Sequence, residues 1–360
     1  MKIVVIGTRG IPNILGGVET HCEELYPRIA AKGHKVIVCR RSCYITSENK
    51  INEYKGVKLK DMYAPRLKSV EALVHSFLAV LYARVQNPDI VHIHAIGPAL
   101  VIPFARLLGL KVVSTNHGPD YDRQKWGKLA KSMLKAGEYF GAKYSNHIIV
   151  ISNVINGIMK NKYNRHDAHL IFNGVSPVEK TINTDYIDSL GLESKKYIVA
   201  VGRFVKEKGF DLLIKAFSSI DNSGYKLVIA GDADHEDSYS KYLKGLAYKE
   251  GVVLTGFIKG EKLNQIMTNA ALFVLPSSHE GLPISLLEAM NYGLDVVVSD
   301  IPANKLPELN AEDFFNSGNT KSLSQIMIRK IKANIQQREY DLSNYDWDYI
   351  SEQVIEVYRS

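Results

Sequence analysis

The chain of 360 residues has few cysteines and no long uninterrupted apolar run. Its three cysteines lie within the first 43 residues, and their odd number favours reduced thiols in a cytosolic protein over a disulfide framework. The most apolar stretch, VHIHAIGPALVIPFARLLGL, is interrupted by histidine, proline and arginine, so we do not expect it to span a bilayer. Met1 leads directly into KIVVIG, which is typical of a strand and not of a signal peptide. These absences favour a cytoplasmic globular protein.

Several nucleotide-binding and nucleic-acid-binding patterns are also missing. The loop GTRGIPNILGG does not spell G-x-G-x-x-G, which argues against a dinucleotide dehydrogenase, and the absence of G-x-x-x-x-G-K-[ST] excludes a P-loop. No zinc finger, RNP motif or basic zipper is present, so nucleic acid is not expected as a partner.

What the sequence does have is an uneven distribution of charge. Residues 1–180 contain 26 Lys and Arg against 13 Asp and Glu, a net charge of +13, whereas the remainder contains 19 against 25, a net charge of −6. A basic half attached to an acidic half favours an anionic partner for one face, and an anionic membrane surface is the remaining candidate. The protein would then be peripheral on the inner face of the plasma membrane.

The segment DRQKWGKLAKSMLKAGEYFGAKY, from residue 122, is the best candidate for such a contact, because it has the pattern of a basic amphipathic helix. Two interpretations stay open: a core-packed helix with a solvated lysine stripe, or a helix that docks on anionic lipid. The lysines expected within about 120° of arc are Lys125, Lys128, Lys131 and Lys135, and the apolar residues expected on another face are Trp126, Leu129, Met133 and Phe140.

Strand and helix patterns alternate along the chain and restart once. The apolar runs KIVVIG, HKVIVCR, DIVHIHA, KVVSTNHG and NHIIVIS are separated by helical patterns, and KYIVAVG opens a second series after about residue 190. We therefore predict two Rossmann-like doubly wound parallel-sheet domains, over residues 1–175 and 190–344, with a final helix over 345–360 that packs back on the first. Ligands in such sheets bind at the carboxyl ends of strands, so the default site is a cleft between the domains.

The stretch SSHEGLPISLLEAM places one glutamate before a helix start and another inside the helix. Pro283 suits the first helical turn, and the N–H groups of Ile284 and Ser285 then face outward at the positive end of the helix, which suits a phosphate. Glu280 and Glu288 would flank that phosphate and accept hydrogen bonds from hydroxyls, as a nucleotide sugar requires. Taken singly, each glutamate has a plainer interpretation, as a partner of the helix dipole or a solvated residue.

Three motifs together resemble one enzyme family. EGLPISLLEA resembles the E-x7-E signature of retaining glycosyltransferases of family 4, VGRFVKEKGFDLLIKAF resembles their second motif, and GGVE at residues 16–19 resembles their N-terminal glycine loop. GTRGIPNILGGVET with HGPDYDRQKWGK is similar to a subgroup that includes bacterial rhamnosyltransferases of polysaccharide biosynthesis. The resemblance covers essentially the whole chain and implies the GT-B fold, in which two Rossmann-like domains face each other across a cleft.

The resemblance also implies roles for individual residues. Arg203 and Lys208 would neutralise the leaving diphosphate, Glu288 would accept from ribose hydroxyls, and His117 would lie beside the donor sugar and acceptor. The expected catalytic residues are Glu280, His117, Arg203 and Lys208. The expected donor-binding residues are Gly16, Gly17, Arg203, Lys208, Glu280, Gly281, Leu282, Ile284, Ser285 and Glu288.

We expect no metal and no other cofactor. His92 and His94 share a strand face, but no third ligand is expected nearby. The D-x-D triplets at residues 120–122 and 232–234 are interpreted as solvated turns, since Arg203, Lys208 and a helix start already supply positive charge.

The predicted function is a metal-independent, retaining glycosyltransferase of the hexosyltransferase type. It would move a sugar, rhamnose being the suggestion of the subgroup, from a nucleoside-diphosphate sugar to a glycan or lipid-linked acceptor of O-antigen, lipopolysaccharide or capsule. A sugar-nucleotide epimerase of the same shape and a non-catalytic nucleotide-sugar-binding module are the alternatives.

Overall fold

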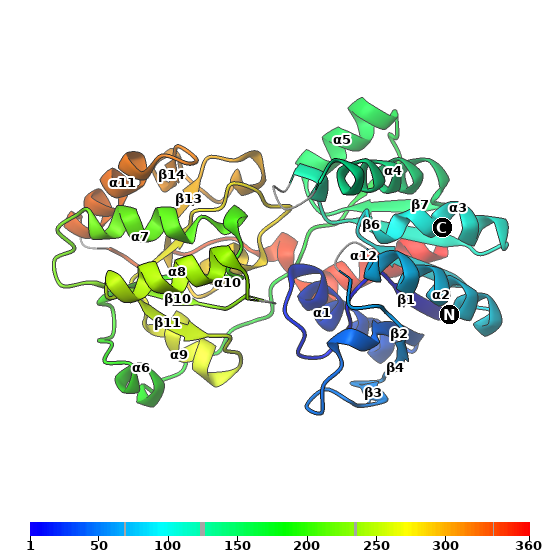
Figure 1. The fold of residues 1–360 in the computed structure, drawn as a ribbon, viewed down its shortest axis with the longest axis horizontal. Helices are drawn as coiled ribbons and strands as arrows, with labels where there is room; N and C mark the ends of the chain where they lie inside the picture. The colour runs from blue at the N-terminus through cyan, green and yellow to red at the C-terminus, as the bar shows by residue number, and fades with distance from the viewer. Residues whose placement is uncertain (68–69, 123–126, 234–235, 334) are drawn as a thin grey trace. The chain divides into compact units, whose positions relative to one another are not determined.

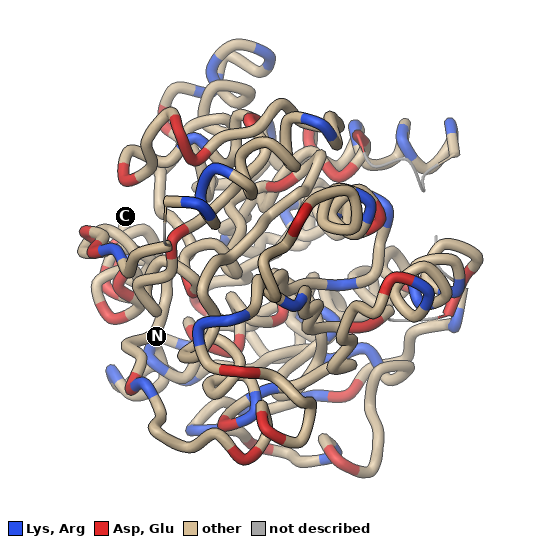
Figure 2. Tube along the Cα trace, turned by 90° about the vertical axis from the view of Figure 1, so that its left-hand side faces the viewer, with Lys and Arg blue, Asp and Glu red and all other residues tan. Residues whose placement is uncertain are grey.

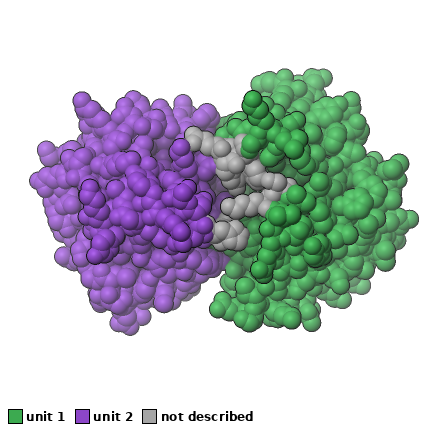
Figure 3. Space-filling view, viewed as in Figure 1, with its two compact units in different colours: residues 1–174, 344–360 green, residues 175–343 purple. Residues whose placement is uncertain are grey.

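The computed structural model of the chain describes residues 1–67, 70–122, 127–233, 236–333 and 335–360. Contacts within the chain divide it into two compact units, coloured separately in Figure 3. Unit 1 is Met1–Gly174 together with Asn344–Ser360, and unit 2 is Val175–Ser343. Each unit has its own sheet and its own core, and each is described by itself.

Unit 1 is built on a sheet of strand order β3-β4-β2-β1-β5-β6-β7-β8, in which every pair is parallel except the β3–β4 hairpin. Its strands are β1 (Lys2–Ile6), β2 (Lys35–Arg41), β3 (Glu53–Tyr54), β4 (Val57–Met62), β5 (Ile90–His94), β6 (Val112–Asn116), β7 (His147–Val150) and β8 (His169–Leu170). Its helices are α1 (Gly17–Ala31), α2 (Glu71–Gln86), α3 (Ile102–Leu107), α4 (Lys128–Tyr144), α5 (Asn153–Tyr163) and α12 (Trp347–Arg359).

The central strands of unit 1 are apolar on both faces because helices cover both sides of the sheet (Figure 1). In β1, Ile3 and Val5 belong to the core beneath α1 and α12, whereas Val4 and Ile6 belong to the core beneath α2 and α3. This alternation is the two-residue period of a strand, and it accounts for the continuous apolar run KIVVIG.

The last helix, α12, belongs to unit 1 although it follows unit 2 in the sequence. Asp346 caps its start by accepting a hydrogen bond from the Tyr349 backbone N–H at 2.8 Å. Trp347 is 2% exposed and lies against Gly174, where a Cβ would come within 2.5 Å of the indole. Glycine is therefore required at the last residue of the main segment of unit 1.

Unit 2 contains an all-parallel sheet of strand order β11-β10-β9-β12-β13-β14. Its strands are β9 (Tyr197–Val201), β10 (Lys226–Ala230), β11 (Val253–Gly256), β12 (Leu272–Leu275), β13 (Asp295–Ser299) and β14 (Phe314–Phe315). Its helices are α6 (Asp185–Ser189), α7 (Phe210–Ser218), α8 (Ser238–Lys249), α9 (Glu261–Asn269), α10 (Ile284–Asn291) and α11 (Thr320–Lys332). Helices α7, α8 and α11 enclose one core and α6, α9 and α10 the other.

The predicted class of two parallel, Rossmann-like α/β sheets is confirmed. Each sheet has one point at which the chain changes direction across the strand order, between β1 and β5 in unit 1 and between β9 and β12 in unit 2. In open α/β sheets ligands bind at such switch points, beside the carboxyl ends of the strands. These two sheet edges are therefore the places where a ligand is expected to bind.

Candidate functional site

The switch point of unit 2 brings together the two loops that carry the E-x7-E and R/K motifs. The loop after β9 contains Arg203 and a 3-10 turn at Lys206–Lys208, and the loop after β12 runs from Pro276 to Pro283. The two loops are in contact: the Ser278 backbone N–H donates to the Glu207 carbonyl at 2.8 Å. Neighbouring parallel strands thus deliver both motifs to one sheet edge.

A glycine makes this close approach of the two loops feasible. Gly209 has φ +65°, and a Cβ there would come within 2.5 Å of the Pro276 carbonyl oxygen. Any other residue would be strained by its backbone conformation and would also push the loops apart. The glycine of the KEKG sequence therefore sets the distance between the motifs.

Lys208 and Glu280 form the central ion pair of this site. The Lys208 Nζ donates to Glu280 Oε1 at 2.6 Å, and the two side chains are only 18% and 12% exposed. Arg203 is half-buried in the same loop, whereas Lys206 is exposed. The structure therefore separates the two lysines of the motif, one held at the site and one in solvent.

The start of α10 lies directly after this pair. Pro283 is the N-cap residue, with φ −75° and ψ 109°, and the helix begins at Ile284, so the prediction that Pro283 sits within the first turn was one residue early. The Leu286 and Leu287 N–H groups donate to the Pro283 carbonyl. The N–H groups of Ile284 and Ser285 precede them and point along the positive end of the helix.

The remaining predicted donor residues of unit 2 flank this helix start. Gly281 is half-buried and Leu282 is buried in the loop, and Glu288 is half-buried on α10. The pKa of Tyr292, one turn further along the helix, is raised to about 12. Burial is the larger cause, and the charge of Glu288 is the next. Glu288 is therefore only partly exposed to solvent and lies close to Tyr292.

The glycine loop of unit 1 lies after β1, at the switch point of that sheet. Gly16 is the N-cap of α1 with φ 149°, and a Cβ there would clash with the Glu19 carboxylate. Glu19 is 6% exposed and its Oε1 accepts from the Arg9 backbone N–H at 2.9 Å. The glutamate of GGVE thus holds the loop in place, a role that the sequence did not predict.

Gly17 differs from its neighbour. It is the first residue of α1, its φ is not positive, and a Cβ there would have nothing within 4 Å. Gly17 therefore needs no positive φ, unlike Gly16, and the open space beside its backbone leaves room for the close approach of a ligand.

His117 follows β6 and lies in a cluster of histidines at the same edge of the unit 1 sheet. Its Nε2 is 2.9 Å from His94 Nδ1, and the ring of His21 packs against both rings, with centroids 5.0 and 5.4 Å away. The expectation of no third ligand beside His92 and His94 is wrong, because α1 and β6 bring in His21 and His117.

Burial governs the protonation of this cluster. It lowers the pKa of His21 to about 4 and that of His92 to about 3, and it holds the pKa values of His94 and His117 well below the ordinary value. All four rings are therefore neutral at pH 7. Sequence reasoning missed His21, whose partner Asn173 lies 152 residues away.

The two D-x-D triplets, which we interpreted as solvated turns, have different surroundings. Asp232, whose side chain is 37% exposed, forms an ion pair with Lys244 of α8 at 2.9 Å, and Asp234 lies outside the described residues. Asp120 and Asp122 belong to a 3-10 turn.

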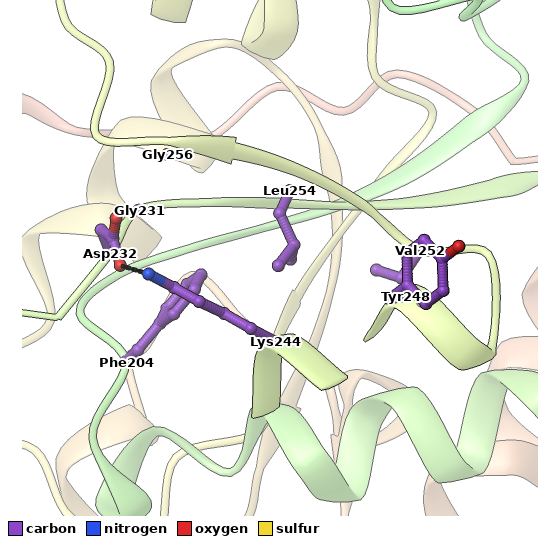
Figure 4. Close-up of a pocket in the computed structure, with 8 residues that line it drawn as sticks. All are labelled: Phe204, Gly231, Asp232, Lys244, Tyr248, Val252, Leu254 and Gly256. Atoms are coloured by element: carbon purple, nitrogen blue, oxygen red, sulfur yellow. Dashed lines mark ion pairs between the residues drawn. The ribbon is translucent and has the colours of Figure 1, made fainter. Parts of the chain in front are cut away.

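The Asp232–Lys244 pair lies at one end of a surface pocket beside β10, β11 and α8, drawn in Figure 4. The pocket has a volume of about 380 Å³. Its lining residues are Phe204, Gly231, Asp232, Lys244, Tyr248, Val252, Leu254 and Gly256. The predicted donor-binding residues are absent from these described lining residues, so this pocket is separate from the Lys208–Glu280 pair.

The basic helix is shorter than predicted. It begins at Lys128, and Lys125 and Trp126 lie outside the described residues. Its buried face consists of Gly137, Glu138, Gly141 and Ala142, and Leu129, expected on an apolar face, is 77% exposed. Tyr139 and Tyr144 are each 40% exposed beside the exposed Lys128, Lys135 and Lys143.

Comparison with protein families identifies the chain. The model described as "Glycosyltransferase Family 4" matches residues 15–179, and the model described as "Glycosyl transferases group 1" matches residues 183–340. The chain is a family 4 glycosyltransferase.

Individual relatives agree with this assignment over most or all of the chain. The glycosyltransferase is 27% identical to an uncharacterized glycosyltransferase of Methanocaldococcus jannaschii, over 100% of this chain and 98% of the relative. It is 21% identical to the amylovoran biosynthesis glycosyltransferase AmsD of Erwinia amylovora, over 76% of each chain. The fold is similar to that of HepE from Anabaena in complex with UDP-glucose, with a TM-score of 0.81, 17% identity and 99% of both chains covered.

The glycosyltransferase thus has the GT-B fold and takes its sugar from a nucleotide sugar. Among its described residues no helix is both long and apolar enough to cross a membrane.

Proposed function

We propose that the donor binds unit 2 at the β9–β12 switch point, with its diphosphate between Lys208 and the start of α10. The observation that carries the proposal is the Lys208–Glu280 ion pair of 2.6 Å, which places a cation and a carboxylate directly before that helix start. Arg203 and Lys208 neutralise the diphosphate, and the N–H groups of Ile284 and Ser285 donate to its oxygens. Glu288 accepts from the ribose hydroxyls.

Glu280 has the role of holding the sugar. Its carboxylate accepts from sugar hydroxyls, assisted by the backbone of Gly281 and Leu282, while its bond to Lys208 keeps it oriented. Negative charge develops on the leaving diphosphate during transfer, and the site must above all stabilise it. Positive groups that are already oriented stabilise this charge without rearranging. Charge balance at the diphosphate therefore requires no metal ion.

Transfer proceeds with retention of configuration. A leaving phosphate oxygen takes the acceptor proton on the same face of the sugar, so no enzymic carboxylate needs to act as a nucleophile. In unit 1, Gly17 leaves its backbone open to a ligand, and His117, neutral because burial lowers its pKa, offers a hydrogen bond and not a positive charge.

The donor that we propose first is a UDP-sugar, because HepE, which is similar in fold, forms a complex with UDP-glucose. The acceptor is a glycan or lipid-linked oligosaccharide of a bacterial surface polysaccharide such as O-antigen or capsule, supported by the likeness to AmsD, which is named for amylovoran biosynthesis. Rhamnose remains a candidate sugar on the likeness of the GTRGIPNILGGVET segment alone.

Membrane contact through α4 forms a further part of the proposal. Figure 2 shows Lys and Arg interspersed with Asp and Glu along the chain, so the net charge alone does not define a basic face. On α4, however, Lys128, Lys135 and Lys143 are exposed beside the exposed Leu129 and Tyr139. Near an anionic bilayer each such lysine contributes about 1 kcal/mol. Salt-sensitive binding to anionic vesicles, weakened by charge removal at these lysines, is the expected result.

The experiment that tests the function is donor-dependent and acceptor-dependent release of nucleoside diphosphate. A thermal-shift panel of UDP, GDP, dTDP and their sugars first identifies the donor, since a ligand at 100 times its Kd stabilises by about 2.7 kcal/mol. Turnover is then measured for the wild type, Lys208→Met and the matched control Lys206→Met, which removes an exposed lysine two residues away. We expect Lys208→Met to lose about 10²–10³-fold in kcat and the control to retain full activity.

The same assay discriminates the alternative functions. Release that depends on an added acceptor indicates a transferase, whereas conversion of the nucleotide sugar without acceptor indicates an epimerase. Tight donor binding with no turnover on any acceptor indicates a binding module. Near-normal turnover of Lys208→Met would refute the proposed site.

A further inference from the structure

Three imidazoles of unit 1 converge on one point at the carboxyl edge of the sheet. His21 comes from α1, His94 ends β5, and His117 follows β6, and one nitrogen of each lies within 4.8 Å of the others. The rings of His21 and His94 are buried, and His117 is half-exposed. The donor-binding scheme uses only one of the three, His117.

His21 leaves a buried nitrogen without a protein partner. Its Nδ1 lies 2.9 Å from the Asn173 Oδ1, to which it donates, so its Nε2 carries the lone pair. That Nε2 has no hydrogen-bond partner, although the residue is only 3% exposed. A buried acceptor left unpaired is destabilising, which calls for an explanation at this position.

The spacing of the three nitrogens suits a four-coordinate metal. Ligands at 2.0–2.1 Å from a tetrahedral Zn²⁺ are about 3.4 Å apart. The His94 Nδ1 and His117 Nε2 are 2.9 Å apart, slightly closer than that, and the whole set is within 4.8 Å. Small side-chain shifts therefore bring all three to ligand distance.

The surrounding hydrogen bonds already favour the ligating tautomers. Asn173 fixes the proton of His21 on Nδ1. The Tyr26 hydroxyl lies against His94 Nε2, and in the tautomer in which this nitrogen donates to the hydroxyl the Nδ1 lone pair is free. Metal ligation then requires only that the proton shared between His94 and His117 moves to an outer nitrogen, so each ring stays neutral.

We propose that His21 Nε2, His94 Nδ1 and His117 Nε2 form a binding site for Zn²⁺ or a similar divalent transition metal. Three neutral imidazoles are a ligand set that Zn²⁺ accepts with one position left open, and the half-exposed His117 gives water or a ligand oxygen access to that position. The site does not depend on the proposed function.

The test is metal binding by the full-length protein, measured by competition with a chromophoric chelator for Zn²⁺ and by the visible spectrum of the Co²⁺ form. We expect one tight equivalent of Zn²⁺ and the intense Co²⁺ bands of a four-coordinate site. His21→Gln should weaken Zn²⁺ binding by more than about 100-fold, and Asn173→Ala, which removes only a positioning residue, by about 10–100-fold.

Two controls make the result specific. His166→Ala removes an exposed histidine, and His169→Ala breaks a second pair of neighbouring rings, His147 and His169, whose centroids are 5.8 Å apart. Neither should change the tight equivalent. Circular dichroism checks that each variant folds, and Asn173→Ala serves as the test if His21→Gln does not fold. No tight binding, binding unaffected by both cluster variants, or binding lost in His169→Ala would overturn the proposal.

Discussion

Replacing Lys208 by methionine and Glu280 by glutamine, singly and together, probes the ion pair on which the donor site depends. The Lys208 Nζ and the Glu280 Oε1 are 2.6 Å apart, and the side chains are 18% and 12% exposed. Two unit charges 2.6 Å apart attract by about 6 kcal/mol at an effective dielectric constant of about 20. Desolvation of both groups offsets most of that attraction, so the net interaction should be about 1–3 kcal/mol.

The double-mutant cycle has two readouts with different expectations. In thermal unfolding, each single variant leaves one charge without its partner, so the double variant should be more stable than the sum of the single effects predicts. A coupling of about 1–3 kcal/mol corresponds to about 2–12 °C in the melting temperature of a unit of this size. In turnover, each single change should cost about 10²–10³-fold, and the double change much less than the product, because the pair acts as one unit.

Urea and thermal unfolding give the first readout, and release of nucleoside diphosphate under saturating donor gives the second. Lys206→Met is the control for both, since Lys206 is exposed in the same turn. A coupling below about 0.3–0.5 kcal/mol with near wild-type turnover in both single variants would refute the reasoning.

Three further predictions concern unit 1. Gly16→Ala should destabilise the protein by about 1–3 kcal/mol in urea unfolding, because the new Cβ meets the Glu19 carboxylate at φ 149°; wild-type stability would contradict this account of the loop. Gly17→Ala should keep wild-type stability, since its Cβ meets nothing within 4 Å, but should weaken donor binding, so an unchanged donor Kd by calorimetry would remove Gly17 from the site. Stability should fall between pH 6.5 and about 4, because burial lowers the pKa values of His21 and His92 to about 4 and about 3 and the unfolded state takes up protons first. Each histidine contributes about 1.4 kcal/mol per pH unit in that window, and a stability that rises on acidification there would be inconsistent with neutral buried rings.

Most of the fold could be predicted from the sequence because the strands are short, apolar on both faces and separated by helical patterns. KIVVIG and KYIVAVG became β1 and β9, the strands on one side of each switch point. The short strands β3 and β14 were missed, because each has only two residues, too few for a periodic pattern. The start of α4 was placed too early, because Gly127 is its N-cap and the helix begins at Lys128.

The candidate site could be predicted only where its residues are close in sequence or belong to a motif. Glu280 and Lys208 were expected to serve one ligand, but their direct contact over 72 residues depends on the pairing of β9 with β12. The contact of His21 with Asn173 links residues 152 positions apart and has no local signal. Such contacts follow from strand order and helix packing, which hydrophobic periodicity alone does not determine.

The most direct test of the central claim is a crystal structure of the protein with bound UDP or, if the thermal-shift panel selects another, the preferred nucleoside diphosphate. The account predicts that the diphosphate oxygens contact the Lys208 Nζ and the backbone N–H groups of Ile284 and Ser285, with a ribose hydroxyl on Glu288. A diphosphate bound elsewhere, for example in the pocket beside Phe204, with the Lys208–Glu280 pair undisturbed, would contradict it.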